Sequence, residues 1–127
     1  MNLLRAVLAA ALLSLCAPGC GPAAPKERSL DEAAARLALA EALDSWKAGR
    51  PHSDPSEEEP ALRVADEDWL AGARLLDYRI LSGDHVVGAT LACPVALVLA
   101  GPDGRRVERQ VTYAVATDPA PSVIRQD

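Results

Sequence analysis

The spacing of apolar residues predicts one long helix, over about residues 30–48. This stretch contains the run AAARLALAEALDSWKA, which consists mainly of strong helix formers. Ser29 and Glu32 have the spacing of a capping box at its start. Gly49, followed by Pro51, ends it.

The apolar residues of this helix fall on two faces rather than on one stripe. Leu39, Leu43 and Trp46 share one face along the C-terminal half. Leu30 and Leu37 lie on nearly the opposite face. We therefore expect the first face to pack on a sheet, and the second to contact a loop, a partner or solvent.

After the helix, residues 50–60 contain three prolines and four acidic residues, which predicts a polar loop. Leu62 and Val64 are expected in a short extended piece. Asp66 has the position of an N-cap for a single helical turn that ends at Gly72.

From residue 73 onward apolar and polar residues alternate, which predicts strands. The expected strands cover residues 73–81, 85–99, 106–117 and 122–126. Turn residues separate them, at Ser82-Gly83-Asp84, Gly101-Pro102-Asp103-Gly104 and Asp118-Pro119-Ala120-Pro121. Pro94 cannot donate a ladder hydrogen bond, so it marks a bulge or an edge-facing position.

Alternation also assigns the strand residues to the two faces of the expected sheet. The first strand carries on one face Leu76, Tyr78 and Ile80. The second alternates through Val87, Ala89, Leu91, Cys93, Val95, Leu97 and Leu99. The third is expected to face inward with Val107, Val111, Tyr113 and Val115. His85 and Cys93 share one face of the expected second strand but lie about 27 Å apart, too far to act together.

These elements predict an α+β domain over residues 29–127, with one long N-terminal helix packed on a three- to four-stranded antiparallel meander. The element order resembles that of cystatin-like and NTF2-like proteins, in which a curved sheet wraps a helix. The segments WKAG, VTYAV and SVIRQD resemble those of small exported proteins from planctomycete-type bacteria, a resemblance that implies no particular activity.

The first 19 residues have the pattern of an export signal. Arg5 provides a positive charge, and the apolar run from Ala6 to Cys16 is interrupted only by Ser14. This run is too short for a membrane-spanning helix, which needs about 20 residues, but it suits a signal-peptide core. The alternative is a buried N-terminal helix of the domain.

The apolar run is followed by Ala17-Pro18-Gly19-Cys20-Gly21, which resembles a bacterial lipobox. The resemblance implies that Cys20 becomes the mature N-terminus and carries a diacylglycerol thioether. Residues 20–28 would then be the lipidated cysteine and a flexible tether, and the protein would be membrane-anchored in the periplasm or on the cell surface. The alternative is plain secretion, with cleavage near residues 17–24.

Composition narrows the class of partners. The 127 residues allow one domain, and the net charge of −5 argues against nucleic acid as a partner. Acylation of Cys20 would leave Cys93 as a lone cysteine, which we expect in the core. If Cys20 were not acylated, a bridge between Cys20 and Cys93 would become conceivable.

The sequence contains few residues that suggest catalysis or ligand binding, and we expect no cofactor and no metal. The sequence contains no phosphate-binding loop, no nucleophile elbow and no paired-cysteine metal spacing. We expect His52 and the acidic cluster at residues 54–59 to be solvated, and the acidic cluster at residues 66–68 to form a helix cap. His85 has a possible role as a general base beside Asp77 or Asp84. The basic spot at Arg105, Arg106 and Arg109 suits lipid headgroups, an acidic partner or a solvated edge.

The leading hypothesis is therefore a non-enzymatic, lipid-anchored envelope protein that binds another protein or a small ligand. The alternative is a small NTF2-like enzyme or ligand carrier with a cavity near Tyr78, His85 and Tyr113. A third possibility is a dimer formed through the open face of the sheet.

Overall fold

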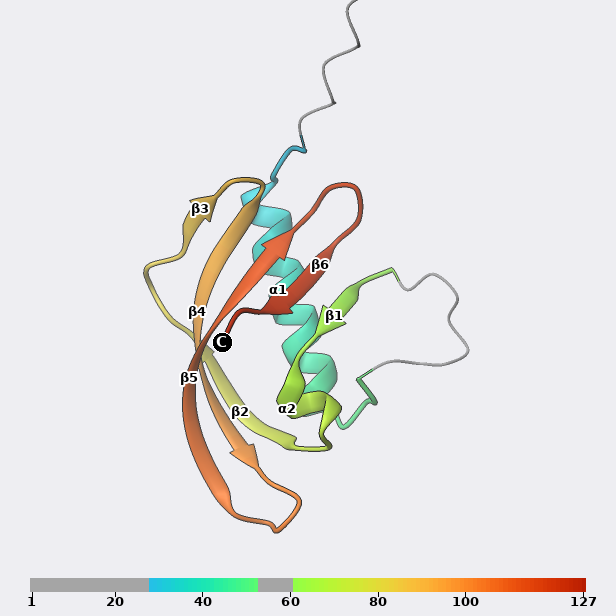
Figure 1. Ribbon diagram of the computed structural model, residues 1–127, viewed down its shortest axis with the longest axis vertical. Helices are drawn as coiled ribbons and strands as arrows, with labels where there is room; N and C mark the ends of the chain where they lie inside the picture. The colour runs from blue at the N-terminus through green and yellow to red at the C-terminus, as the bar shows by residue number, and fades with distance from the viewer. Residues whose placement is uncertain (1–27, 53–60) are drawn as a thin grey trace, which may run out of the picture.

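The structure, a computed structural model, describes residues 28–52 and 61–127. It combines one long helix with a strongly curled sheet that wraps around it (Figure 1). The elements are α1 (Glu32–Lys47), β1 (Arg63–Ala65), α2 (Glu67–Leu70), β2 (Arg74–Ile80), β3 (His85–Val87), β4 (Thr90–Ala100), β5 (Arg106–Ala116) and β6 (Ser122–Arg125). The predicted α+β class is confirmed.

The sheet is mixed, so the prediction of a purely antiparallel meander is wrong. Its strand order is β1-β6-β5-β4-β2, and β3 pairs with β4. The pairs among β2 to β6 are antiparallel, whereas β1 runs parallel to β6, with Val64 opposite Val123. The amide of Arg63 donates to the carbonyl of Pro121 at 3.0 Å, which helps to hold β1 on this edge.

The single strand predicted over residues 85–99 is instead a hairpin of β3 and β4. Val87 pairs with Thr90, which leaves Gly88 and Ala89 as a two-residue turn. Gly88 has a φ of +60°, a conformation that glycine adopts without steric cost. The alternation of apolar residues continues through this turn and therefore hides it.

Asp31, and not Ser29, caps α1, so the predicted capping box is wrong. The Asp31 side chain accepts a hydrogen bond from the amide of Ala34 at 3.0 Å. The amide of Ser29 instead donates to Asp118 Oδ2, also at 3.0 Å. This long-range contact draws Ser29 away from the first turn of the helix.

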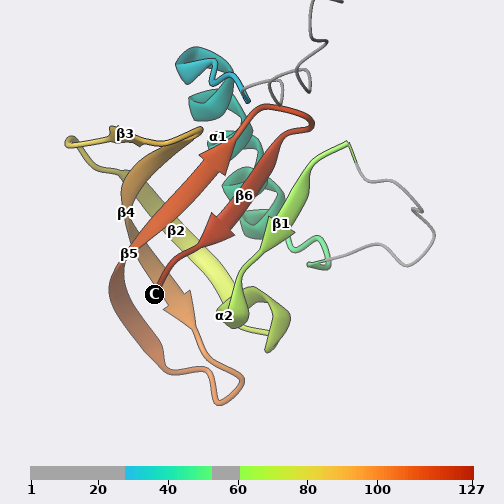
Figure 2. The same cartoon turned by 45° about the horizontal axis from the view of Figure 1, so that its top comes forward.

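The core fills the space between α1 and the inner face of the sheet (Figure 2). The helix buries the predicted face of Leu39, Leu43 and Trp46, while Leu37 on the other face is 72% exposed. The buried strand residues are Leu75, Leu91, Cys93, Val95, Leu97, Leu99, Val111, Tyr113, Val115 and Val123. The expected packing of one helical face on the sheet is thus confirmed.

Two inner-face predictions fail at the edges of the sheet. In β2 the register shifts between Leu75 and Asp77, so Leu75 is buried and Leu76 is exposed. Tyr78 and Ile80 pair with Leu97 and Val95 of the inner face, so these two share one face as predicted, although Ile80 at the strand end is 38% exposed. In β5 the prediction holds for Val111, Tyr113 and Val115. Val107 is exposed because the β4–β5 hairpin extends past the end of the helix that would cover it (Figure 1).

Several sequence predictions lie outside the described residues: the signal peptide at residues 1–19, the acylation of Cys20, most of the tether and the acidic run of the loop. Within residues 28–52 and 61–127, no helix is long and apolar enough to cross a membrane.

Candidate functional site

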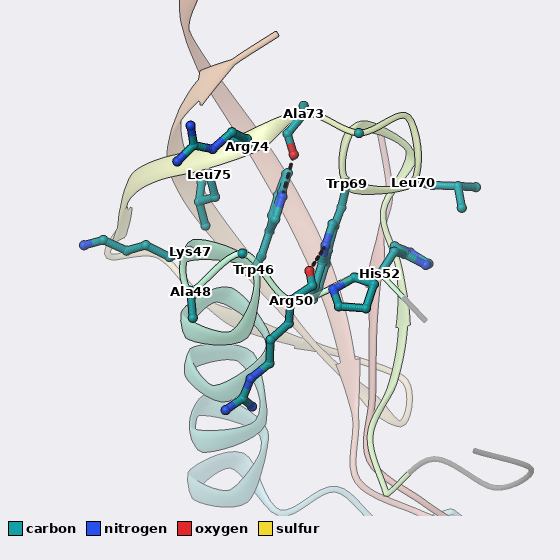
Figure 3. A pocket seen from close by; sticks show the side chains of 13 residues that line it. Trp46, Lys47, Ala48, Arg50, His52, Trp69, Leu70, Ala73, Arg74 and Leu75 are labelled. Atoms are coloured by element: carbon teal, nitrogen blue, oxygen red, sulfur yellow. Dashed lines mark hydrogen bonds between the residues drawn. The ribbon is translucent and has the colours of Figure 1, made fainter. Parts of the chain in front are cut away.

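A stacked pair of tryptophans closes the C-terminal end of α1. The indole rings of Trp46 and Trp69 lie 5.4 Å apart between centroids, with 8° between their planes (Figure 3). The indole N–H of Trp46 donates to the carbonyl of Ala73 at 2.8 Å, and that of Trp69 donates to the carbonyl of Arg50 at 3.0 Å. Both rings are therefore fixed by packing and by a hydrogen bond.

The single turn of α2 positions Trp69. Asp66 caps this turn, as the sequence predicted. Asp66 Oδ1 accepts from the amides of Asp68 and Trp69, at 2.9 and 3.1 Å. The amide of Asp66 itself donates to His52 Nε2 at 3.1 Å. The imidazole also packs edge-on against the Trp69 ring, with centroids 5.4 Å apart.

His52 is therefore half-buried and bonded, and the prediction that it is solvated is wrong. The reason is non-local, because its partners Asp66 and Trp69 follow it by 14 and 17 positions. An amide N–H can only donate, so Nε2 is the unprotonated nitrogen of the ring.

A cavity of about 480 Å³ lies beside the tryptophan pair. It is bounded by the end of α1, by residues 48–52 and by the chain from α2 into β2 (Figure 3). The lining residues are Trp46, Lys47, Ala48, Gly49, Arg50, Pro51, His52, Trp69, Leu70, Gly72, Ala73, Arg74 and Leu75. Three of these residues are cationic and none carries a carboxylate, although the whole chain has a net charge of −5.

Of the three cationic side chains that line this cavity, only Lys47 forms an ion pair with a described carboxylate. Lys47 Nζ lies 3.3 Å from Asp77 Oδ1, and the amide of Tyr78 together with this ammonium lowers the pKa of Asp77. Among the described residues, no carboxylate forms an ion pair with Arg50 or Arg74. No described carboxylate therefore competes with an anionic ligand for these two guanidinium groups.

Three carbonyl groups in the last turn of α1 accept hydrogen bonds from the residues that follow the helix. The amides of Ala48 and Gly49 donate to the carbonyls of Asp44 and Trp46, each at 2.9 Å. The amide of Arg50 donates to another carbonyl of the last turn at 3.1 Å. Because the cations nearby also balance the negative end of the helix dipole, this surface is not strongly repulsive to an anion.

A second hollow of about 380 Å³ lies on the other side of His52 and Leu70. Behind it Arg125 and Asp66 form a buried ion pair, with Arg125 Nη1 3.4 Å from Asp66 Oδ1. The hydroxyl of Tyr113 donates to Asp66 Oδ2, and Arg125 also donates to Asp68. Arg125 Nε is buried without a hydrogen-bond partner among the described residues.

This buried cluster holds the fold together rather than offering a free base. Both carboxylate oxygens of Asp66 already accept hydrogen bonds. Burial, together with the bond to Asp66, raises the pKa of Tyr113. The sequence predicted Asp66 as a cap, but its link to Arg125 spans 59 positions and has no local signal.

The three predicted ligand-binding residues lie in separate places. Tyr113 faces the core and binds Asp66, as described above. Tyr78 also faces inward, where its hydroxyl donates to Asp44 Oδ1 at 2.6 Å, a bond that raises its pKa to about 12. His85 pairs with Ala92 and so lies on the outer face of the sheet, with Nδ1 3.2 Å from the carbonyl of Gly83.

Cys93 is buried in the core, as expected from the sequence, and burial raises the pKa of its thiol. It does not share a face with His85, and that prediction is wrong because the Gly88 turn places them on different strands.

The structure separates Arg109 from the other two arginines of the predicted basic spot. Arg109 lies opposite Leu97 on the inner face and forms an ion pair with Asp68 at 3.1 Å. Arg105 and Arg106 are exposed near the tip of the β4–β5 hairpin. A third hollow, of about 500 Å³, lies across β2, β4 and β5 and has lining residues of both charges.

Among these features, the cavity beside the tryptophans is the strongest candidate site. Sequence reasoning placed Trp46 and Trp69 in the core but did not bring them together, because they are 23 positions apart on different elements. In the part of the chain that the structure describes, no three His, Cys, Asp or Glu side chains are grouped to hold a metal ion. Comparison with known proteins gave no match to a family model, a curated protein or a solved structure.

Proposed function

We propose that this protein is a lipid-anchored protein of the cell envelope whose domain binds a small anionic ligand without transforming it. The observation that carries the binding role is the cavity at the end of α1, which combines fixed aromatic rings with Arg50 and Arg74, neither of which pairs with a described carboxylate. The support for the anchor is the lipobox-like sequence around Cys20.

The size and lining of the cavity suit a small organic ligand. Its volume of about 480 Å³ falls within the range of roughly 300–1,000 Å³ that is usual for ligand pockets. Because both indole rings are held by hydrogen bonds, the site is largely preformed, which lowers the entropic cost of binding. A carboxylate on an apolar or aromatic body fits this combination, since Arg50 and Arg74 favour a planar anion.

The polar groups near the cavity favour binding over catalysis. His52 Nε2 accepts from the backbone, and Asp66 is occupied by its cap and by Tyr113. Neither is free to take a proton from a substrate. The alternative of an NTF2-like enzyme or carrier has less support, because its proposed residue His85 lies on the outer face of the sheet. A distant relation to cystatin-like and NTF2-like folds remains our proposal, supported by a curled sheet around one helix.

The ligand class can be tested with intrinsic fluorescence, because the chain has two tryptophans and both line the cavity. We would titrate the protein with phenylacetate and with its neutral analogue phenylacetamide. Saturable quenching by the carboxylate, and not by the amide, is expected. An equal response to both probes would contradict an anionic site.

A matched pair of variants locates the binding. The double variant Arg50→Gln, Arg74→Gln should lose the response to phenylacetate. Arg79→Gln, which removes an exposed cation of β2 outside the cavity, should retain it. Unchanged binding in the double variant would move the site elsewhere.

The anchor is tested by the intact mass of protein extracted with detergent from its native membranes. A chain that begins at Cys20 and carries a diacylglyceryl group would support the proposal. An unmodified chain with another N-terminus would indicate a soluble exported protein.

A further inference from the structure

The chain enters the domain at one fixed end. The amide of Ser29 donates to Asp118 Oδ2, and the amide of Asp31 donates to Thr117 Oγ1, each at 3.0 Å. Both acceptors belong to the turn between β5 and β6. The described part of the chain therefore begins beside this turn, at the top of Figure 1.

The β3–β4 hairpin lies at the same end. At the start of β4, Leu91 pairs with Val115, two residues before Thr117. Arg36 Nε, in the second turn of α1, lies 2.7 Å from Asp84 Oδ2, just before β3. Figures 1 and 2 agree in placing β3 near the N-terminal end of α1.

This hairpin exposes apolar side chains and carries no charge near its tip. Val86 is 52% exposed and Val87 is 55% exposed, and Gly88 and Ala89 follow them. By contrast, the β4–β5 hairpin at the opposite end has the sequence GPDGRR. The two hairpins therefore differ in polarity.

We propose that the hairpin of residues 86–89 rests in the interface of the lipid bilayer that holds the acylated Cys20. This inference depends on the anchor proposed above. Eight residue steps separate Cys20 from Arg28, which allows a reach of at most about 28 Å. The anchor thus keeps the hairpin near the membrane, where even a weak apolar contact is favoured by its high effective concentration.

This contact would fix the direction in which the cavity faces relative to the membrane. The 16 residues of α1 extend over about 24 Å, with the tethered end at one terminus and the cavity at the other. A domain resting on the β3–β4 hairpin directs the cavity away from the membrane. The ligand would then reach it from the aqueous side.

The experiment uses the full lipidated protein in vesicles of phosphatidylethanolamine and phosphatidylglycerol. An environment-sensitive dye is attached to a Val87→Cys variant and, as a control, to an Asp103→Cys variant in the opposite hairpin. Cys93 is buried and the thiol of Cys20 is acylated, so the introduced cysteine is the one that reacts. We expect a blue shift and loss of quenching by aqueous iodide at position 87, with neither effect at position 103.

A second variant tests whether the apolar surface causes this contact. Adding Val86→Asp to the Val87→Cys variant should restore quenching while the protein stays on the vesicles. Full quenching at position 87 in a protein whose mass confirms acylation would overturn the inference and leave the anchor intact. A mass without the acyl group would overturn both. A blue shift that persists without vesicles would mean that copies of the chain meet through the hairpin, which would also overturn it.

Discussion

Arg125 and Asp66 form an ion pair in the interior, with 3.4 Å between Nη1 and Oδ1 and side chains only 5% and 1% exposed. The pair joins the last strand, β6, to the cap of α2. Because α2 carries Trp69, the pair also fixes one wall of the candidate site. A buried ion pair is costly to break, since the remaining charge loses its partner without regaining water.

We therefore predict that Asp66→Asn destabilises the fold strongly. The change removes one of the carboxylates that face Arg125, of which Asp68 remains, and it weakens the acceptor for Tyr113. A loss of about 3 kcal/mol in the free energy of unfolding is expected, because breaking one side of a buried pair costs this much. Urea unfolding, followed by circular dichroism, measures it.

The control for this prediction is Glu41→Gln, which removes a carboxylate from the exposed side of α1. Its effect should stay within about 0.5 kcal/mol, as is usual for surface substitutions. If both variants had the same stability, the buried pair would contribute nothing beyond a surface charge.

A second prediction concerns the tryptophan stack. Trp69→Phe keeps an aromatic ring against Trp46 but removes the N–H that donates to the carbonyl of Arg50. We expect a loss of about 2 kcal/mol from the missing hydrogen bond and the reduced packing, against about 3–5 kcal/mol for Trp69→Ala. Thermal or urea unfolding of the two variants gives the comparison. Equal stability of Trp69→Phe and the parent protein would show that the indole N–H is not needed.

The elements that the sequence predicted correctly depend on neighbours along the chain. Asp66 was recognisable as a cap because the residues that it caps follow at once. The alternation from Leu91 to Leu99 gave the buried face of β4, because strand geometry alone sets that period. Each of these signals is complete within about ten residues.

The errors arose where distant residues decide the structure. Val87 and Ala89 continue the apolar alternation, so the turn at Gly88 could not be distinguished from a strand. Pairing of β1 with β6 depends on residues about 59 positions apart, such as Val64 and Val123. Neither strand is long enough to indicate its partner.

The candidate site was not predictable for the same reason. Its cavity is lined by the end of α1, the segment after it and the start of β2. The cavity exists only because the fold places these three segments side by side. Arg50 and Arg74 are ordinary surface residues in the sequence, and only the fold brings them to one cavity, whose described lining contains no carboxylate. The residues that the sequence favoured were His85, which lies on the outer face of the sheet, and the two tyrosines, whose hydroxyl groups donate to Asp44 and Asp66.

A third prediction tests the turn between β3 and β4. Gly88→Ala should destabilise the protein by about 1 kcal/mol, since a φ of +60° is unfavourable for a residue with a Cβ atom. The added methyl group meets no atom within 4 Å, so the cost is conformational and not steric packing. Gly88→Asn should cost less, because asparagine tolerates this conformation better. Equal losses measured in urea for the two variants would contradict this origin.

The last prediction concerns alkaline pH and the two tyrosines of the chain. The bond to Asp44 and partial burial raise the pKa of Tyr78 from 10.0 to about 12, and burial raises that of Tyr113. A raised pKa means that the folded state holds the phenolic proton more tightly than the unfolded state does. The contribution of protonated Tyr78 to the free energy of unfolding is therefore complete below pH 10 and is lost as the pH rises towards 12. Ultraviolet absorbance of the phenolate should therefore stay low at pH 10 and increase only as the protein unfolds. Tyr78→Phe should reduce the loss of stability between pH 10 and 12. If both tyrosines ionised near pH 10 while the protein was still folded, the hydroxyl groups would not be bonded as described.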